Sequence, residues 1–292
     1  MSTTVIIPTK NEVNNIEAVI ASVSFADEIL VVDSFSTDGT VEKAMNLGAK
    51  ILQRTFDYHA AQKNWAIPQA KHDWILLVDA DERVTPELKK EIISVLQQKE
   101  IKEKAFWIKR INHFMGQRVH YSGWRNDAVI RLFDKKYSRY EDIFVHEEII
   151  CTGTTGKLKH KLSHNTYKNF DAYIQKMNRY ATQQAKVYDL KTGKITPYHL
   201  VLKPFWGFFK HYIVQSGFRD GFVGFTFFGF CLGTQYTVFI DLPFISPCIA
   251  FALFKPIFIS LSGVSSSSSR SANCGNVTGV PSPFRTPVFP FC

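Results

Sequence analysis

Two carboxylates follow the most apolar strand-like run of the chain. Residues 74–78 are a Trp and four branched apolar residues, and the run stops at Asp79 and Asp81. Because alternate side chains of a strand point to the same side, these two acids are expected to lie close together. Close carboxylates repel, so they share a proton or bind a cation, often a divalent one near phosphate. The sequence therefore predicts a metal site, the alternative being an acidic turn with Glu82 and Arg83 as solvated charges.

Two earlier strand-like runs also end in polar residues. Residues 4–8 lead into 9–12, and residues 28–32 lead into 33–40. Helical spacing of apolar residues follows each of them, and alternating strands and helices predict right-handed crossovers and a mostly parallel sheet flanked by helices. In such sheets ligands bind beyond the carboxyl ends of the strands. We therefore expect an α/β fold in which the polar strand ends line one crevice.

The glycine patterns exclude two classes of nucleotide site. No G-x-G-x-x-G follows the first strand, and no G-x-x-x-x-G-K-[ST] occurs. A dinucleotide fold and a P-loop NTPase are both disfavoured. Acids at several strand ends suit a nucleotide whose base and ribose meet carboxylates and whose diphosphate is held by a metal.

Local signals predict several element boundaries. Thr85 and Pro86 form a helix start, and Gly48 stands where a left-handed cap is expected. A strand is expected at 50–54 and a helix at 60–70. Between residues 105 and 133 the pattern changes to antiparallel-looking strands.

The charge limits the possible binding partners, and the cysteine usage limits the cellular compartment. The net charge is +9 and the isoelectric point is about 9.2, which favours an anionic membrane surface or substrate; no nucleic-acid motif is present. Five scattered cysteines without a C-x-x-C pair indicate a reducing compartment without structural zinc. The first strand begins at once, with no signal-peptide pattern, so the catalytic part is expected in the cytosol.

The C-terminal part differs in composition from the rest. We expect a catalytic domain at 1–168 and a helical, aromatic and basic, membrane-associating appendage at 169–239, because residues 203–212 mix aromatic rings with bases as lipid interfaces do. Residues 240–292 are rich in Pro, Ser and Phe and are expected to be disordered.

Three motifs resemble those of a known family. They are Pro8-Thr9-Lys10-Asn11-Glu12, then Asp33-Ser34 with Thr37-Asp38-Gly39-Thr40, then Asp79-Ala80-Asp81-Glu82. Their order and spacing resemble the family 2 glycosyltransferases with a GT-A fold. With Gln62-Lys63-Asn64, Trp124-Arg125, Val145-His146-Glu147 and the aromatic segment through 217–221, the chain resembles bacterial lipopolysaccharide or lipooligosaccharide core β-glucosyltransferases over residues 4–239. Beyond Phe239 it departs from them.

The resemblance implies a role for each motif residue. Pro8, Thr9, Asn11 and Glu12 would contact uridine and ribose, Asp33 would read the uracil, Lys63 would approach the diphosphate, and Asp79 would touch the ribose or sugar side. Asp81, with Asp79 and His146 as further candidates, would ligate Mg²⁺ or Mn²⁺, which neutralises charge on the leaving diphosphate. The base would be Glu147 or, as second choice, Asp142, the alternative being a solvated surface acid.

Aromatic residues near the sheet suggest an acceptor site. Tyr121, Trp124 and Arg125 suit sugar stacking, with core packing or loop support as the alternative.

The resemblance thus implies a metal-dependent, inverting transfer of a hexose, glucose from UDP-glucose, to the heptose inner core on a lipid carrier. The enzyme would be peripheral on the inner face of the bacterial inner membrane. The alternatives are a glycosyltransferase for another surface glycan and a non-catalytic membrane assembly protein with the same fold. A sugar-1-phosphate nucleotidyltransferase is disfavoured, because residues 8–12 are not a glycine-rich basic loop.

Overall fold

The computed structural model describes residues 1–142, 148–167, 170–171, 173–175, 177–178, 196 and 198–226. The chain divides into two compact units, Met1–Tyr173 and Ile174–Cys292. The expected boundaries near residues 168 and 239 stay predictions, and the tail 240–292 lies outside the described residues.

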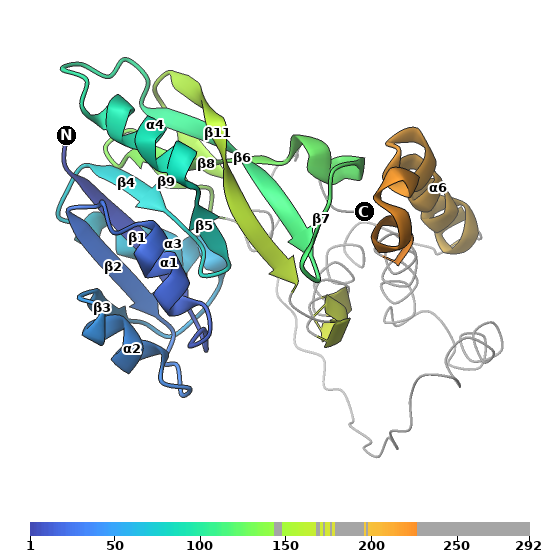
Figure 1. Cartoon of the computed structure of the whole chain (residues 1–292), viewed down its shortest axis with the longest axis horizontal. Helices are drawn as coiled ribbons and strands as arrows, with labels where there is room; N and C mark the ends of the chain where they lie inside the picture. Colours follow the sequence, from blue (N-terminus) through green and yellow to red (C-terminus); the bar gives the residue numbers. More distant parts are fainter. Residues whose placement is uncertain are drawn as a thin grey trace, which may run out of the picture. The chain divides into compact units, whose positions relative to one another are not determined.

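The first half of the sheet is parallel (Figure 1). It consists of β1 (Thr3–Thr9), β2 (Glu28–Asp33), β3 (Lys50–Gln53) and β4 (Trp74–Leu77) in the order β3-β2-β1-β4. β1 pairs in parallel with both β2 and β4. The chain moves outward from β1 to β3 and then returns to the other side of β1, so the order reverses between β1 and β4. This reversal point is where open α/β sheets bind ligands.

The second half of the sheet is mixed. Its strands are β5 (Glu82–Val84), β6 (Ala105–Phe114), β7 (Gln117–Arg118), β8 (Ala128–Asp134) and β11 (Thr155–Tyr167). The order continues from β4 as β8-β6-β11-β5, with β7 beside β6. β8 is antiparallel to β4 and β6, which confirms the antiparallel strands expected between residues 105 and 133. A separate hairpin pairs β9 (Ser138–Tyr140) with β10 (Ile149–Cys151).

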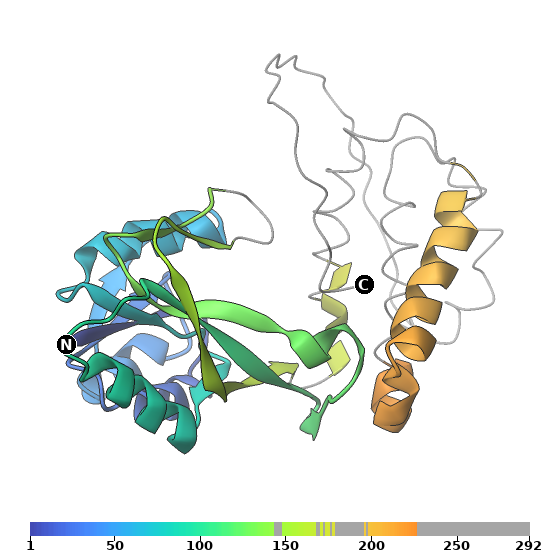
Figure 2. The same ribbon diagram turned by 90° about the horizontal axis from the view of Figure 1, so that it is seen from above.

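Helices cover both faces of the sheet (Figure 2). α1 (Ile16–Ser22), α2 (Thr40–Asn46) and α4 (Pro86–Leu96) contribute to one apolar core, together with Val5, Ile7 and Leu76. α3 (His59–Ala66) and the β9–β10 hairpin contribute to the other core, with Ile6, Ile75 and Leu77. Neighbouring residues of β1 and β4 thus enter opposite cores, as a central strand buried on both faces requires.

Several predicted boundaries are confirmed. The Thr85 hydroxyl accepts a hydrogen bond from the Leu88 amide at 3.2 Å, so it caps α4. Gly48 has a φ of +82°, the left-handed conformation expected after α2. The helix expected at 60–70 is α3 followed by a 3₁₀ turn, Ile67–Gln69. Strand β5 was not expected, because only three residues form it.

The described part of the second unit is helical. A π-helical turn (Tyr198–Leu202), α6 (Lys203–Phe209) and a second π-helical turn (Lys210–Val214) follow one another, and a 3₁₀ turn spans Gly217–Asp220. Among the described residues, no helix combines the length and the apolar character needed to cross a bilayer.

Candidate active site

The loops after β1 and β2 are joined into one wall beyond the carboxyl ends of the two strands. The Asn11 amide donates to the Ser36 hydroxyl at 2.8 Å, and the Asn11 side-chain oxygen accepts from the Thr37 amide at 2.9 Å. The Glu12 amide donates to the Thr40 hydroxyl at 2.8 Å. These bonds join the two strand ends that the sequence predicted to lie together. Pro8 and Glu12 are half-buried, Thr9 is buried and Asn11 is exposed.

Asp33 holds this wall in shape. Its carboxylate is completely buried and accepts from the Ser36 amide at 2.9 Å, the Gln53 amide nitrogen at 3.2 Å and the Thr9 hydroxyl at 3.4 Å. The Ser36 hydroxyl donates to it as well. A contact between Asp33 and uracil stays a prediction. In the structure its carboxylate fixes the loop that such a base would meet.

The two predicted acids follow β4 in a tight turn. The Glu82 amide donates to the Asp79 carbonyl at 2.9 Å, and the Asp79 amide donates to the Glu82 carboxylate at 3.1 Å. The side chains of Asp79 and Asp81 are 32% and 27% exposed, whereas that of Glu82 is completely buried. The alternative of Glu82 as a solvated charge is therefore wrong, because this acid anchors the turn from inside.

Arginines from β6 and β8 balance these acids. Arg131 donates to the Glu82 carboxylate at 2.7 Å and also to the Asp79 carboxylate. Arg110 lies 3.4 Å from the same Glu82 oxygen and makes a two-pronged ion pair with Asp127, both bonds at 2.8 Å. Three carboxylates and two guanidinium groups thus form one connected cluster, which we call the ion-pair cluster.

The ion-pair cluster sets the protonation state of Asp79. Burial alone raises the pKa of this carboxyl, but the charges of Arg131 and then Lys63 outweigh it and hold the pKa far below its ordinary value. The Lys63 ammonium is 3.9 Å from the Asp79 carboxylate and lies over the Tyr140 ring, 4.8 Å from its centroid. Lys63 is buried, so the structure brings together these two residues of the predicted donor site.

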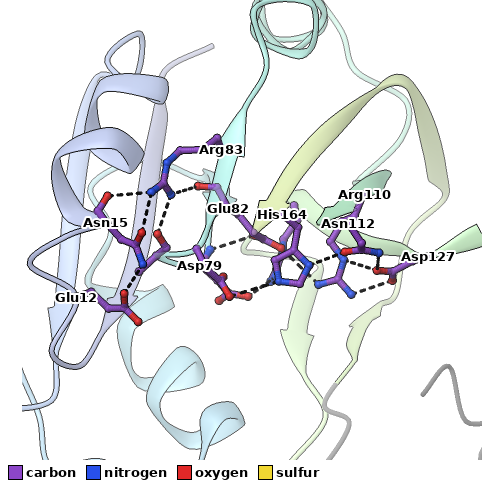
Figure 3. A network of polar contacts seen from close by, with 12 residues as sticks. Glu12, Asn15, Asp79, Glu82, Arg83, Arg110, Asn112, Asp127 and His164 are labelled. Atoms are coloured by element: carbon purple, nitrogen blue, oxygen red, sulfur yellow. Dashed lines mark hydrogen bonds and ion pairs between the residues drawn. The ribbon is translucent and has the colours of Figure 1, made fainter. Parts of the chain in front are cut away.

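Asp81 has a different partner. The Nε2 atom of the buried His164 lies 3.4 Å from its carboxylate. The other ring nitrogen of His164 is 2.6 Å from the Asn112 side-chain oxygen, and the Asn112 amide nitrogen donates to Asp127 at 2.7 Å (Figure 3). That second bond orients the Asn112 amide with its oxygen toward His164. The Nδ1 atom therefore donates to Asn112, and Nε2 faces Asp81.

Sequence reasoning missed five residues here: Arg110, Asn112, Asp127, Arg131 and His164. One signal was present. Arg110 and Asn112 are polar residues two apart on a strand face whose neighbouring positions, Ile108 and Phe114, are apolar, an arrangement that indicates a buried polar contact.

One candidate for the base, Asp142, borders a cavity. Asp142 is exposed, and the Tyr58 hydroxyl donates to its carboxylate. It lines a cavity of about 590 Å³ between α3 and the β9–β10 hairpin, where Arg54, Trp65 and Arg139 also lie. The other base candidate, Glu147, and the metal candidate His146 lie outside the described residues.

The residues before β8 were expected either to stack on an acceptor sugar or to serve core packing or loop support. Trp124 is 3% exposed, which matches core packing. Tyr121 is half-buried and Arg125 is exposed, so a role of these two in acceptor binding stays a prediction.

The comparisons with known proteins agree with this fold. The profile described as glycosyl transferase family 2 matches residues 4–155. An uncharacterized glycosyltransferase of Rickettsia felis is 31% identical over 229 residues, 74% of this chain and 81% of that protein. The lipopolysaccharide core biosynthesis glycosyltransferase LpsC of Rhizobium meliloti is 29% identical over 215 residues, 70% of this chain and 78% of that protein.

A solved structure of glucosyl-3-phosphoglycerate synthase from Mycobacterium tuberculosis, in complex with Mn²⁺, UDP and glucosyl-3-phosphoglycerate, has a TM-score of 0.32 and 23% identity. The match covers 38% of this chain and 44% of that chain.

The chain belongs to glycosyl transferase family 2. It is a glycosyltransferase, and the GT-A type α/β fold expected from its motifs is confirmed.

Replacing Arg131 with methionine tests the ion-pair cluster. The change removes the guanidinium that Asp79 and Glu82 share, so the free energy of unfolding at pH 7 is expected to fall by about 3–5 kcal/mol in urea titrations. Because the folded-state pKa of Asp79 lies below its unfolded value of about 3.9, the wild-type stabilisation is complete above that pH. It is lost as pH falls toward the folded-state pKa, so the difference between variant and wild type narrows by about 1.4 kcal/mol per pH unit below pH 4.

Arg131→Lys is the matched control, because it keeps the charge but loses the planar fork, and an intermediate loss is expected. A difference between Arg131→Met and wild type that stays constant from pH 7 to pH 3 refutes the assignment of the Asp79 shift to Arg131.

Proposed function

We propose that the protein is an inverting, metal-dependent glycosyltransferase that moves a hexose, glucose from UDP-glucose, onto a heptose of the lipopolysaccharide or lipooligosaccharide inner core. The observation that carries this proposal is the convergence of three polar strand ends, those of β1, β2 and β4, at the reversal point of a family 2 sheet. The donor class follows from the family. The particular sugar and acceptor rest on the resemblance and on the LpsC relative.

In this proposal the joined loops of β1 and β2 hold the nucleoside. Pro8, Thr9, Asn11 and Glu12 line the wall for uridine and ribose. The hydrogen bonds of Asp33 and those of the Asn11 amide and side-chain oxygen hold this wall in place. Asp79 meets the ribose or sugar side, kept ionised by Arg131 and Lys63. Lys63 also supplies a positive charge toward the diphosphate.

The residues around Asp81 fit a divalent cation. A carboxylate oxygen and an imidazole nitrogen both ligate Mn²⁺, and Mg²⁺ bound with nucleotides is held by one or two carboxylates together with phosphate oxygens. Asp81 is partly exposed, and His164 directs Nε2 toward it while its other nitrogen is fixed by Asn112, the arrangement usual for a ligating histidine. Asp79 is less suited, because two cations already balance its charge. A bound Mg²⁺ or Mn²⁺ would neutralise charge on the leaving diphosphate.

The transfer itself needs a base on the acceptor side. The acceptor hydroxyl oxygen attacks the anomeric carbon while the bond from that carbon to the diphosphate oxygen breaks, and the nucleotide diphosphate leaves with the electron pair. Glu147 or Asp142 takes the hydroxyl proton. The cavity beside Asp142, with its aromatic rings and two arginines, is a suitable place for an acceptor saccharide.

We further propose that the acceptor is lipid-linked and that the enzyme works on the inner face of the bacterial inner membrane. The alternatives are transfer to another surface glycan and a non-catalytic assembly role. Turnover of a nucleotide sugar separates the second alternative from both enzymatic ones.

Asp81→Asn tests the metal site. We expect Mn²⁺-dependent binding of UDP-glucose, measured by isothermal titration calorimetry, to weaken at least about tenfold, since a neutral amide is a poor ligand for a hard cation. Asp73→Asn is the matched control, because Asp73 is a surface acid paired with Lys136 and should leave binding unchanged. Equal affinities for Asp81→Asn and wild type, with EDTA without effect on either, would falsify the metal site.

Two further variants identify the base. Asp142→Asn and Glu147→Gln each remove one candidate carboxylate, and the true base is expected to lower kcat by about 10²–10⁴ without changing donor affinity. Initial rates on extracted core acceptor, together with UDP-glucose titrations, separate the two. If both variants keep wild-type kcat, neither acid is the base.

A further inference from the structure

The helical segment at residues 198–226 exposes many large apolar side chains. Phe222 is 82% exposed, Phe205 63% and Trp206 61%. Further apolar side chains in the same segment are also exposed: Tyr198, Leu202, Phe209, Ile213, Val214, Phe218 and Phe225. So much exposed apolar surface within one short segment marks an interaction site.

Most of these side chains belong to one helical run. Tyr198, Leu202, Phe205, Phe209 and Ile213 follow one another at intervals of three or four residues, and Trp206 stands beside Phe205. Residues at such intervals lie on the same side of a helix. We call these six residues the apolar face. Pro204 and His211, by contrast, are buried, so the run has one packed side and one exposed side. The run is drawn in orange in Figures 1 and 2.

The apolar face is accompanied by positive charge. Lys203 and Lys210 lie within the same helical run, and Arg219 follows in the next turn, whereas Asp220 is the only acid among residues 198–226. Lys210 is exposed and Lys203 is half-buried. Aromatic rings, aliphatic side chains and lysines on one side of a helix are the combination that binds the interface of a bilayer with anionic lipids.

We propose that the apolar face is a membrane-docking surface, which lies in the plane of an anionic bilayer with its rings in the head-group region and Lys203 and Lys210 on the lipid phosphates. The charge favours lipid over a second copy of this chain, because two such faces brought together would oppose like charges. This inference rests on the proposed function and deepens it, because it names the surface that would hold the enzyme at the membrane.

Vesicle binding by the full chain tests the proposal. The wild-type protein is expected to sediment with vesicles of phosphatidylglycerol and phosphatidylcholine and to remain in solution with phosphatidylcholine alone. Phe205→Gln combined with Trp206→Gln should weaken binding to anionic vesicles about tenfold or more, because two rings leave the interface. Met45→Gln combined with Leu47→Gln is the control, since these exposed residues lie in the first unit and should leave binding unchanged.

The lysines are tested separately. Lys203→Gln combined with Lys210→Gln is expected to weaken binding to anionic vesicles about 25-fold, and raised salt should weaken the wild type in the same direction. Lys99→Gln combined with Lys102→Gln removes two exposed lysines of the first unit and should have little effect.

Tryptophan fluorescence shows which surface enters the lipid. Trp206 is far more exposed than Trp74 or Trp124, which are 4% and 3% exposed. Brominated phosphatidylglycerol should therefore quench wild-type emission, and Trp206→Phe should remove most of this quenching while vesicle binding persists.

Three results overturn the proposal: no binding of the wild type to anionic vesicles, wild-type affinity of the Phe205 and Trp206 double variant, or quenching that persists in Trp206→Phe. Light scattering that shows a dimer broken by the double variant assigns the face to a second copy instead. UDP-glucose titration of each variant in the absence of lipid shows whether donor binding is intact. Failure of the docking proposal is thereby distinguished from failure of the proposed function.

Discussion

The ion pair between Arg131 and Glu82 is the interaction on which the rest of the site depends. Glu82 is completely buried and Arg131 is 4% exposed, so neither charge is stabilised by water. The pair joins the turn after β4 to the middle of β8, two segments far apart in the sequence but adjacent in the sheet. Because Glu82 also accepts from the Asp79 amide, the same carboxylate fixes the backbone that presents Asp79 and Asp81.

A buried ion pair of this kind adds little net stability over apolar residues of the same size, although removing one partner alone is costly. Removing a carboxylate and a guanidinium from water costs several kcal/mol each, and their attraction offsets that cost only when the geometry is good. Here Arg110 also pairs with Asp127, and Asn112 links Asp127 to His164 through hydrogen bonds. Asp79 and Asp81 thus stand in different environments, one between two cations and the other beside an imidazole. A donor site needs this difference if one acid is to meet a sugar and the other a metal.

Much of the fold was predictable, because its signals are local. Buried strands appear as apolar runs, the start of α4 as Thr85 and Pro86, and the end of α2 as Gly48. The polar strand ends were predictable for the same reason, once the alternation of strands and helices implied a parallel sheet. The ion-pair cluster was not predictable from the sequence. Its arginines come from β6 and β8, and the acid that each arginine contacts depends on strand order and register. The burial of Glu82 was not predictable for the same reason, since a charged residue in a turn is usually solvated.

The measurement that tests the central claim most directly is a crystal structure with UDP and Mn²⁺, with anomalous data collected for manganese. The account predicts a single strong anomalous peak at bonding distance from the Asp81 carboxylate, uridine against the loops after β1 and β2, and the Arg131 and Glu82 pair intact. A manganese peak away from Asp81, or UDP bound outside the crevice between β1 and β4, would contradict it.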